Sequence, residues 1–200
     1  MSTRYTILVD NGHGCDTCGK RSPDGTFLEY AYSRQVAAAV VAALSSYGHD
    51  ARLLVPEDND VPLSERVRRA NAVSQSKGSA GVVLVSIHVN AAGNGTAWQT
   101  ARGWQVCLAP NASLRSMTLA ENLADAAARS GLKVRRPRPT QKAWTQNLAI
   151  CRDTRCPAVL TENLFMDNRD DLAFLMSEEG FRAIVTTHVQ GIIDYMQTWR

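Results

Sequence analysis

The chain has 200 residues, of which 44% are hydrophobic, and its formal net charge at pH 7 is +3. This length fits one domain with a full hydrophobic core, and the small net charge argues against nucleic acid as a partner. No stretch approaches the roughly 20 apolar residues of a membrane helix, so we expect no membrane insertion.

Short apolar runs alternate with helical patterns along the first half of the chain. Strands are expected at residues 5–10, 51–55 and 81–88, and helices at residues 30–47 and 62–77. The runs are rich in β-branched residues and stop abruptly, which is typical of buried strands. A glycine follows each of the two expected helices, as is common at helix ends.

The second half continues the same alternation, with loops expected at residues 91–102 and 133–147, strands at 103–108, 148–151 and 157–161, and helices at 113–130 and 178–199. Strands that alternate with helices predict an α/β fold. We expect a single domain over residues 1–200, with a twisted, mostly parallel sheet flanked by helices on both faces.

Two groups of residues allow more than one interpretation. The basic cluster at residues 133–138 is either a solvated loop, which we favour, or a contact for an anionic substrate. Cys15 and Cys18 form a CxxC pair in a polar loop, and Cys151 and Cys156 form a second close pair. We expect a local disulfide or free thiols there rather than a four-cysteine zinc site.

Two histidines stand where predicted strands end. His13 lies in a glycine-rich turn after the first strand, and His88 ends the apolar run at residues 81–88. Polar groups at the carboxyl ends of such strands face the crevice where α/β proteins bind ligands. Because neutral imidazole suits zinc, and a catalytic zinc commonly has three protein ligands plus water, the pair predicts one metal site.

The residue types alone leave the third metal ligand open. Glu29 lies just before a predicted helix, where the helix dipole also favours an acid. His49 follows a helix end and His188 lies near the core face of the last helix, so both have structural explanations. Asp10 is either a ligand or a residue that orients His13 from behind.

A further carboxylate and two tryptophans are candidates for the chemistry and for substrate contacts. Glu162 follows the buried strand at residues 157–161, where its proton affinity should be raised, as suits a general base. A salt bridge at the strand end is the alternative. Trp98 and Trp144 fall in predicted loops and could contact sugar or peptide, whereas Trp104 begins a strand and is expected in the core.

Five stretches, in order along the chain, resemble the catalytic domain of the zinc-dependent N-acetylmuramoyl-L-alanine amidases of type 3, which hydrolyse peptidoglycan. They are residues 9–14 (Asp-x-Gly-His-Gly), residues 28–34 (an acid at a helix start), residues 63–71 (Leu-x-x-Arg, then Ala-Asn), residues 85–90 (Ser-Ile-His-x-Asn) and residues 157–171 (Pro-Ala-Val-Leu-x-Glu, then Asn and Asp). Together they cover nearly the whole chain. The chain departs from the family pattern at Asn11, in the Cys15–Cys18 loop and at Asn163.

The resemblance implies specific roles for the candidate residues. His13, Glu29 and His88 would be the ligands of one zinc ion, and Glu162 would be the catalytic acid and base. Asn90, in the Ser-Ile-His-x-Asn stretch, is an expected substrate contact.

The implied reaction is hydrolysis of the amide between the lactyl group of muramic acid and L-alanine, with peptidoglycan as partner and action at the cell wall. No secretory signal precedes the first strand, so we expect phage-type release, as for an endolysin, or a mature bacterial enzyme. We expect a monomer. A zinc amidohydrolase of small acyl-amino acids or free peptides, and a non-catalytic wall-binding module, stay open as alternatives.

Overall fold

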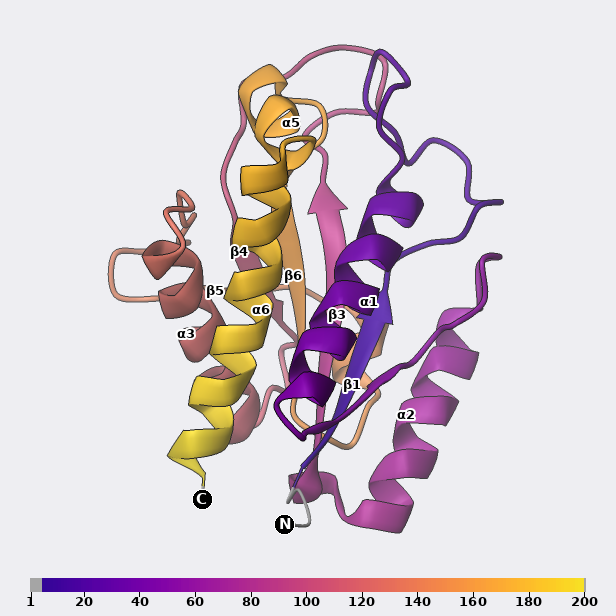
Figure 1. Cartoon of the computed structure of the whole chain (residues 1–200), viewed down its shortest axis with the longest axis vertical. Coiled ribbons are helices and arrows are strands. Elements are labelled where there is room, and N and C mark those ends of the chain that lie inside the picture. Colours follow the sequence, from indigo (N-terminus) through magenta and orange to yellow (C-terminus); the bar gives the residue numbers. More distant parts are fainter. Residues whose placement is uncertain (1–4, 200) are drawn as a thin grey trace.

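A six-stranded, mostly parallel sheet forms the centre of the computed structural model, which describes residues 5–199 (Figure 1). The strand order is β2-β1-β3-β6-β4-β5. Neighbouring strands are parallel except β4 and β6, which are antiparallel. The strands are β1 (Thr6–Asn11), β2 (Asp50–Leu53), β3 (Val82–Asn90), β4 (Gln105–Leu108), β5 (Ala143–Thr145) and β6 (Ala158–Phe165).

Helices cover both faces of this sheet, which confirms the predicted fold class. They are α1 (Glu29–Ser46), α2 (Leu63–Lys77), α3 (Leu114–Arg129), α4 (Ala149–Arg152), α5 (Arg169–Leu175) and α6 (Glu178–Thr198), with a short 3-10 helix at Ser79–Gly81. The larger core cluster joins α1, α3, α5 and α6 to one face, and a smaller cluster joins α2 and α4 to the other. In Figure 1, α1 and α6 lie in front of the strands.

Alternation along the central strands decides which side chains share a face. In β3, Val83, Val85 and Ile87 belong to the larger cluster, whereas Val82 and Leu84 belong to the smaller one. Because side chains alternate with a period of two, polar residues later in the strand fall on the face of α2 and α4. The same argument places Glu162 of β6 on that face, since Leu160 packs there.

The structure corrects three of the predicted elements. The predicted loop at residues 133–147 contains the short strand β5, which pairs with β4, and the predicted strand at residues 148–151 is helical as α4. Short apolar runs do not distinguish strand from helix by periodicity. The strand expected to end before Glu162 continues as β6 to Phe165, because the segment beyond the acid is buried. Helix α5 was not expected.

All five cysteines are free. Of the two expected alternatives, a local disulfide and free thiols, the structure has free thiols. Cys15 and Cys18 are exposed, whereas Cys107, Cys151 and Cys156 are buried in the smaller core cluster. Trp104 is fully buried, as expected for a core residue. Among residues 5–199, no helix has the length and hydropathy needed to cross a bilayer.

His188 is a structural residue rather than a ligand of the predicted site. It is fully buried in α6, with Nδ1 2.8 Å from the carbonyl oxygen of Ile184 and Nε2 2.9 Å from Oγ1 of Thr161. A carbonyl only accepts, so Nδ1 carries the proton and Nε2 accepts from the threonine hydroxyl. Burial lowers the pKa of His188 to about 4 because the charged ring would be desolvated.

Acid should therefore destabilise the fold through His188. An unfolded histidine has a pKa of about 6.5, above the folded value of about 4, so the unfolded chain binds a proton first and stability is lost as the pH falls between these values. From pH 7 to pH 5 this group should remove about 2 kcal/mol from the free energy of unfolding. In urea denaturation, His188→Gln should lose about 2 kcal/mol less than wild type over this interval. Equal losses in the two proteins would contradict the prediction.

Candidate metal centre and active site

His13, Glu29 and His88 converge at the carboxyl edge of the sheet. Nε2 of His13 lies 3.4 Å from one oxygen of Glu29, and Nδ1 of His88 lies 3.0 Å from the other. The three potential ligand atoms are all within 4.8 Å of one another, and in residues 5–199 this is the one such group of three found. The structure thus brings the three predicted ligands together, while Asp10, His49 and His188 lie outside the group.

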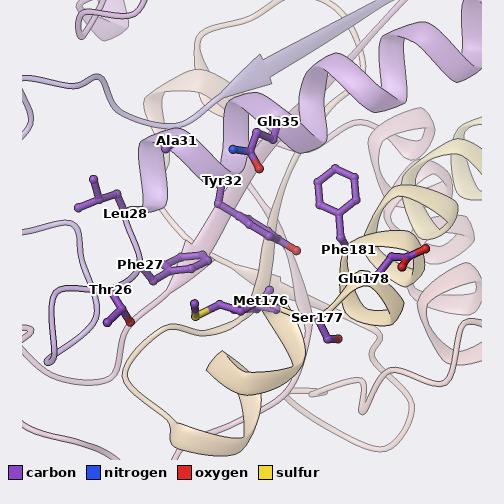
Figure 2. A pocket seen from close by; sticks show the side chains of 11 residues that line it. Thr26, Phe27, Leu28, Ala31, Tyr32, Gln35, Met176, Ser177, Glu178 and Phe181 are labelled. Carbon is purple, nitrogen blue, oxygen red and sulfur yellow. The ribbon is translucent and has the colours of Figure 1, made fainter.

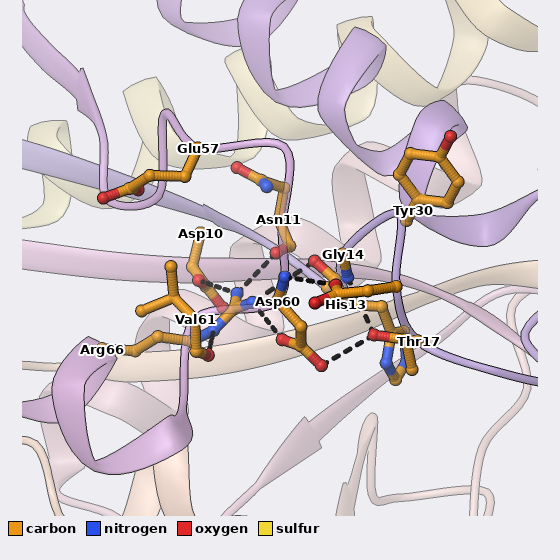
Figure 3. Close-up of polar contacts among 12 residues, drawn as sticks. Asp10, Asn11, His13, Gly14, Thr17, Tyr30, Glu57, Asp60, Val61 and Arg66 are labelled. Atoms are coloured by element: carbon orange, nitrogen blue, oxygen red, sulfur yellow. Dashed lines mark hydrogen bonds and ion pairs between the residues drawn. The ribbon is translucent and has the colours of Figure 1, made fainter.

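The side chain of Arg66 holds the turn that carries His13 through hydrogen bonds to the backbone of the turn. Nη1 of Arg66 donates to the backbone oxygen of Asn11 (2.6 Å) and to Asp10 (2.7 Å). Nη2 donates to the backbone oxygen of His13 (3.3 Å) and to Asp60 (3.0 Å) (Figure 3). His13 has a φ of 61°, a left-handed conformation that costs energy in a non-glycine residue. The buried arginine therefore fixes a strained turn at the site.

Asp10 lies behind this turn. Its carboxylate accepts hydrogen bonds from Arg66 and from Oγ of Ser86, and it is almost fully buried. It therefore acts on the backbone of the His13 turn through Arg66. Gly12 in the same turn has a packing reason as well, since a Cβ there would lie 2.3 Å from the His88 ring.

Glu29 is the first residue of α1 and is almost fully buried. Its Oε1 also accepts a hydrogen bond from the backbone nitrogen of Val89. Burial opposes its charge, but the hydrogen bonds and charges of His13 and His88 outweigh burial and hold the pKa of Glu29 far below its usual range. The site therefore presents a buried carboxylate between two imidazoles, which is a donor set that catalytic zinc sites use.

Glu162 lies beside this group on the neighbouring strand. It is the register partner of His88 in the β3–β6 pairing, so both side chains lie on the face of α2 and α4. Its Oε2 is buried and has no hydrogen-bond partner, and among residues 5–199 it forms no ion pair. Burial raises the pKa of Glu162 to about 7, against the opposing effect of His88. This environment matches the raised proton affinity expected of a general base.

Sequence reasoning assigned no role to two residues that support the site, Arg66 and Asn163. The Asn163 amide donates to the backbone oxygen of His88 (2.8 Å) and accepts from Nε1 of Trp104 (2.8 Å). It thus ties the end of β3 to the larger core from the opposite face of the sheet. The sequence did offer one signal for Asn163, which is an amide side chain in a buried strand. A buried amide must find hydrogen-bond partners.

The three predicted substrate contacts have different surroundings. Oδ1 of Asn90 accepts from the backbone nitrogen of Ala91, at an irregularity in the β3–β6 pairing. Trp98 lies in a loop, as expected, but it packs against the larger core and the Arg169 guanidinium covers its ring at 4.3 Å. Trp144 lies on β5 rather than in a loop and packs with the smaller cluster, on the Glu162 face.

A cavity of about 360 Å³ opens beside the two histidines. Its walls combine His13, His88 and Arg66 with apolar side chains from the α2 and α4 regions, among them Leu63 and Ile150. Because the imidazoles of His13 and His88 line it, the cavity is part of the site.

A larger hollow, of about 600 Å³, lies between the start of α1 and the α5–α6 junction (Figure 2). Phe27, Leu28, Tyr32, Met176 and Phe181 are among its lining residues. None of the three potential metal ligands lines it, and neither does Glu162, so size alone does not mark the chemistry of this chain.

Comparisons with known proteins identify the family of this chain. The model of the N-acetylmuramoyl-L-alanine amidase family matches residues 7–194. Among curated relatives, an endolysin of Bacillus phage SPP1 is 27% identical over 95% of this chain, and the amidase CwlM of Bacillus licheniformis is 29% identical over 93%. The matches span only 65% and 66% of those relatives' lengths, which is slightly less than two thirds.

Solved structures show the same fold. The N-acetylmuramoyl-L-alanine amidase of Clostridium difficile 630 superposes with a TM-score of 0.82 at 25% identity, over 98% of this chain and 99% of that one. The amidase Ami1 of Mycobacterium smegmatis, at 22% identity, has a TM-score of 0.82 over 97% of both chains and supports the fold alone. The resemblance expected from the sequence is confirmed, and the chain belongs to the N-acetylmuramoyl-L-alanine amidase family.

Proposed function

We propose that this chain hydrolyses the amide that joins the lactyl group of N-acetylmuramic acid to L-alanine in peptidoglycan. The observation that carries the proposal is the gathering of His13, Glu29 and His88, with Glu162 opposite His88 on the next strand. Membership of the amidase family supports this choice of bond. Residues 1–200 would act as one catalytic domain, as a monomer, at the cell wall, after phage-type release or as a mature bacterial enzyme.

His13, Glu29 and His88 would hold one zinc ion. Their ligand atoms are close enough to share an ion, and the deeply buried Glu29 carboxylate would be compensated by a cation. Zinc bound there would supply Lewis-acid chemistry, because it makes water more acidic and polarises an amide carbonyl.

Glu162 would hold and move the proton. A carboxylate whose pKa is raised to about 7 can accept a proton from water near neutral pH and can return it to the amine nitrogen that leaves. The unpartnered Oε2 of Glu162 is the atom that would carry this proton. Asn90, Trp98 and Trp144 are proposed substrate contacts, and Trp144 has the stronger support because it shares the face of Glu162.

The products identify the bond that is cleaved. Digestion of purified cell walls should release free stem peptides that begin with L-alanine and should leave glycan with unsubstituted lactyl groups. Mass spectrometry of the soluble products measures both. Peptides cut at an internal bond, or turnover of small acyl-amino acids without release from walls, would assign the site to another amidohydrolase.

Replacing Glu162 should separate proton transfer from metal binding. Glu162→Gln keeps the size of the side chain but removes the base, so the rate of release of new amino termini should fall by about 10²–10⁴-fold, while zinc content stays at the wild-type level. The matched control is Glu121→Gln, an exposed position on α3, which should keep full activity. Wall hydrolysis by Glu162→Gln at the wild-type rate would show that another group is the base.

Replacing His88 should remove the metal instead. His88→Ala deletes one ligand and leaves the Glu29 carboxylate with one imidazole partner, so zinc affinity should drop by more than the roughly 10–100-fold that loss of an outer-shell partner costs. Elemental analysis after dialysis should give one zinc per chain for wild type and much less for the variant. His49→Ala, outside the group, serves as the control and should keep its zinc. Unchanged zinc content in His88→Ala would contradict the ligand assignment.

A further inference from the structure

The basic cluster at residues 133–138 is not uniformly solvated. Lys133, Arg136 and Arg138 are exposed, whereas Arg135 is partly buried. The backbone of Arg135 is fixed on Trp104: its nitrogen donates to the Trp104 oxygen (2.7 Å), and the Trp104 nitrogen donates to the Lys133 oxygen (2.8 Å). The segment therefore runs beside the start of β4, and Arg135 has a defined place.

Gly103 makes this close approach possible. Its φ is 105°, and a Cβ at this position would lie 2.6 Å from the Lys133 backbone oxygen and 3.0 Å from Cγ of Arg135. Any larger residue would push the segment away from the sheet. The chain thus brings one particular arginine against the edge of the site.

The guanidinium of Arg135 lies near two aromatic rings and retains spare donors. It lies 4.8 Å from the centre of the Phe165 ring and 5.6 Å from that of Trp144. Nη1 donates to Oε1 of Gln105 (2.7 Å). Within residues 5–199, no carboxylate pairs with it in an ion pair shorter than 4.0 Å. A guanidinium offers five donors in a fixed fork that matches a carboxylate, so this arrangement is suited to an anionic group of the substrate.

Gln105 links this arginine to the general base. It is directly opposite Glu162 in the antiparallel β4–β6 pairing, and it is almost fully buried. Opposite side chains in such a pair have Cβ atoms about 4.5–5.5 Å apart, so the guanidinium that Gln105 binds lies at the same edge of the sheet as the Glu162 carboxyl. Trp144 pairs in register with Cys107 and shares this face.

The chemistry of the stem peptide fits this arrangement. The lactyl carboxyl is consumed in the bond that is cut, so the nearest free carboxylate is the α-carboxylate of the second stem residue, a γ-linked glutamate. That carboxylate lies two residues of extended peptide beyond the scissile carbon, and each residue spans about 3.3–3.6 Å, so the two groups are roughly 7 Å apart. In some walls this group is an amide, which cannot accept two parallel hydrogen bonds from a guanidinium.

We propose that Arg135 is a specificity-determining residue that binds the free α-carboxylate of the second stem residue and disfavours the amidated form. The inference rests on the proposed amidase function, because it assumes that the scissile bond lies at Glu162. Gln105 acts as a positioning residue, since it orients the guanidinium through Nη1.

The test compares two soluble muropeptides that differ only in this group, one with glutamate and one with isoglutamine as second residue. Wild type should cleave the glutamate form with a kcat/KM about 10–100-fold higher, the range expected for a charged hydrogen bond. Arg135→Gln should reduce this ratio to near one through a higher KM for the glutamate form, and Arg135→Lys should give an intermediate ratio. Arg136→Gln, which removes the same charge from an exposed neighbour, should keep the wild-type ratio.

A measurement on wild type alone covers the case in which the Arg135 variants do not fold. The free dipeptide L-alanyl-γ-D-glutamate should inhibit wild type at least about tenfold more strongly than the isoglutamine dipeptide. Equal kcat/KM for both muropeptides, or a ratio that Arg135→Gln leaves intact, would overturn the role of Arg135 while the amidase function stands. Failure of wild type to cut either muropeptide would instead remove the proposed function, and this inference with it.

Discussion

The buried carboxylate of Glu29 is the constraint on which the rest of the site depends. It joins the turn after β1, the start of α1 and the end of β3, which are far apart in the sequence. A lone buried carboxylate would be costly, because desolvation of an ion in a protein interior costs several kcal/mol. The two imidazoles and the Val89 amide compensate it in the structure, so the same contacts that stabilise the fold here also assemble the predicted set of metal ligands.

The ligands need support from outside the group, and it comes from the two faces of the sheet. On the α2 face, Arg66 holds the strained backbone of His13 while pairing with Asp10. On the α6 face, Asn163 holds the backbone of His88 and is itself held by Trp104. Each imidazole is therefore fixed by a residue that does not touch the ligand atoms, which is how a site keeps its geometry within the tolerance that catalysis needs.

Much of the fold could be predicted from the alternation of strands with helices, because long apolar runs and long amphipathic segments are easy to identify in the sequence. The positions of His13 and His88 near the ends of β1 and β3 followed from the same pattern, although β3 continues past His88 to Asn90. The third ligand did not, since Glu29 at a helix start is equally well explained by the helix dipole. Only the folded chain shows that Glu29 lies between the two imidazoles.

The errors also have physical causes. The strand β5 is too short for its sequence to show the alternation of buried and exposed residues. Pairing with β4, rather than local propensity, makes this segment a strand. The helix α4 contains an apolar run whose periodicity fits either element. The role of Arg66 depends on a buried ion pair with Asp10, 56 positions away in sequence, and no local pattern encodes such a partner.

The antiparallel strand β4 adds residues to the active-site edge that a parallel strand would place at the opposite edge. In a fully parallel sheet, the carboxyl edge receives only the residues that follow each strand. Because β4 runs the other way, the residues that precede it, Gly103 and Trp104, reach the same edge as Glu162. They bring the 133–135 segment with them. The parallel strands and the turn after β1 thus supply the two histidines and the proposed base, whereas the reversed strand brings Arg135 to the same edge.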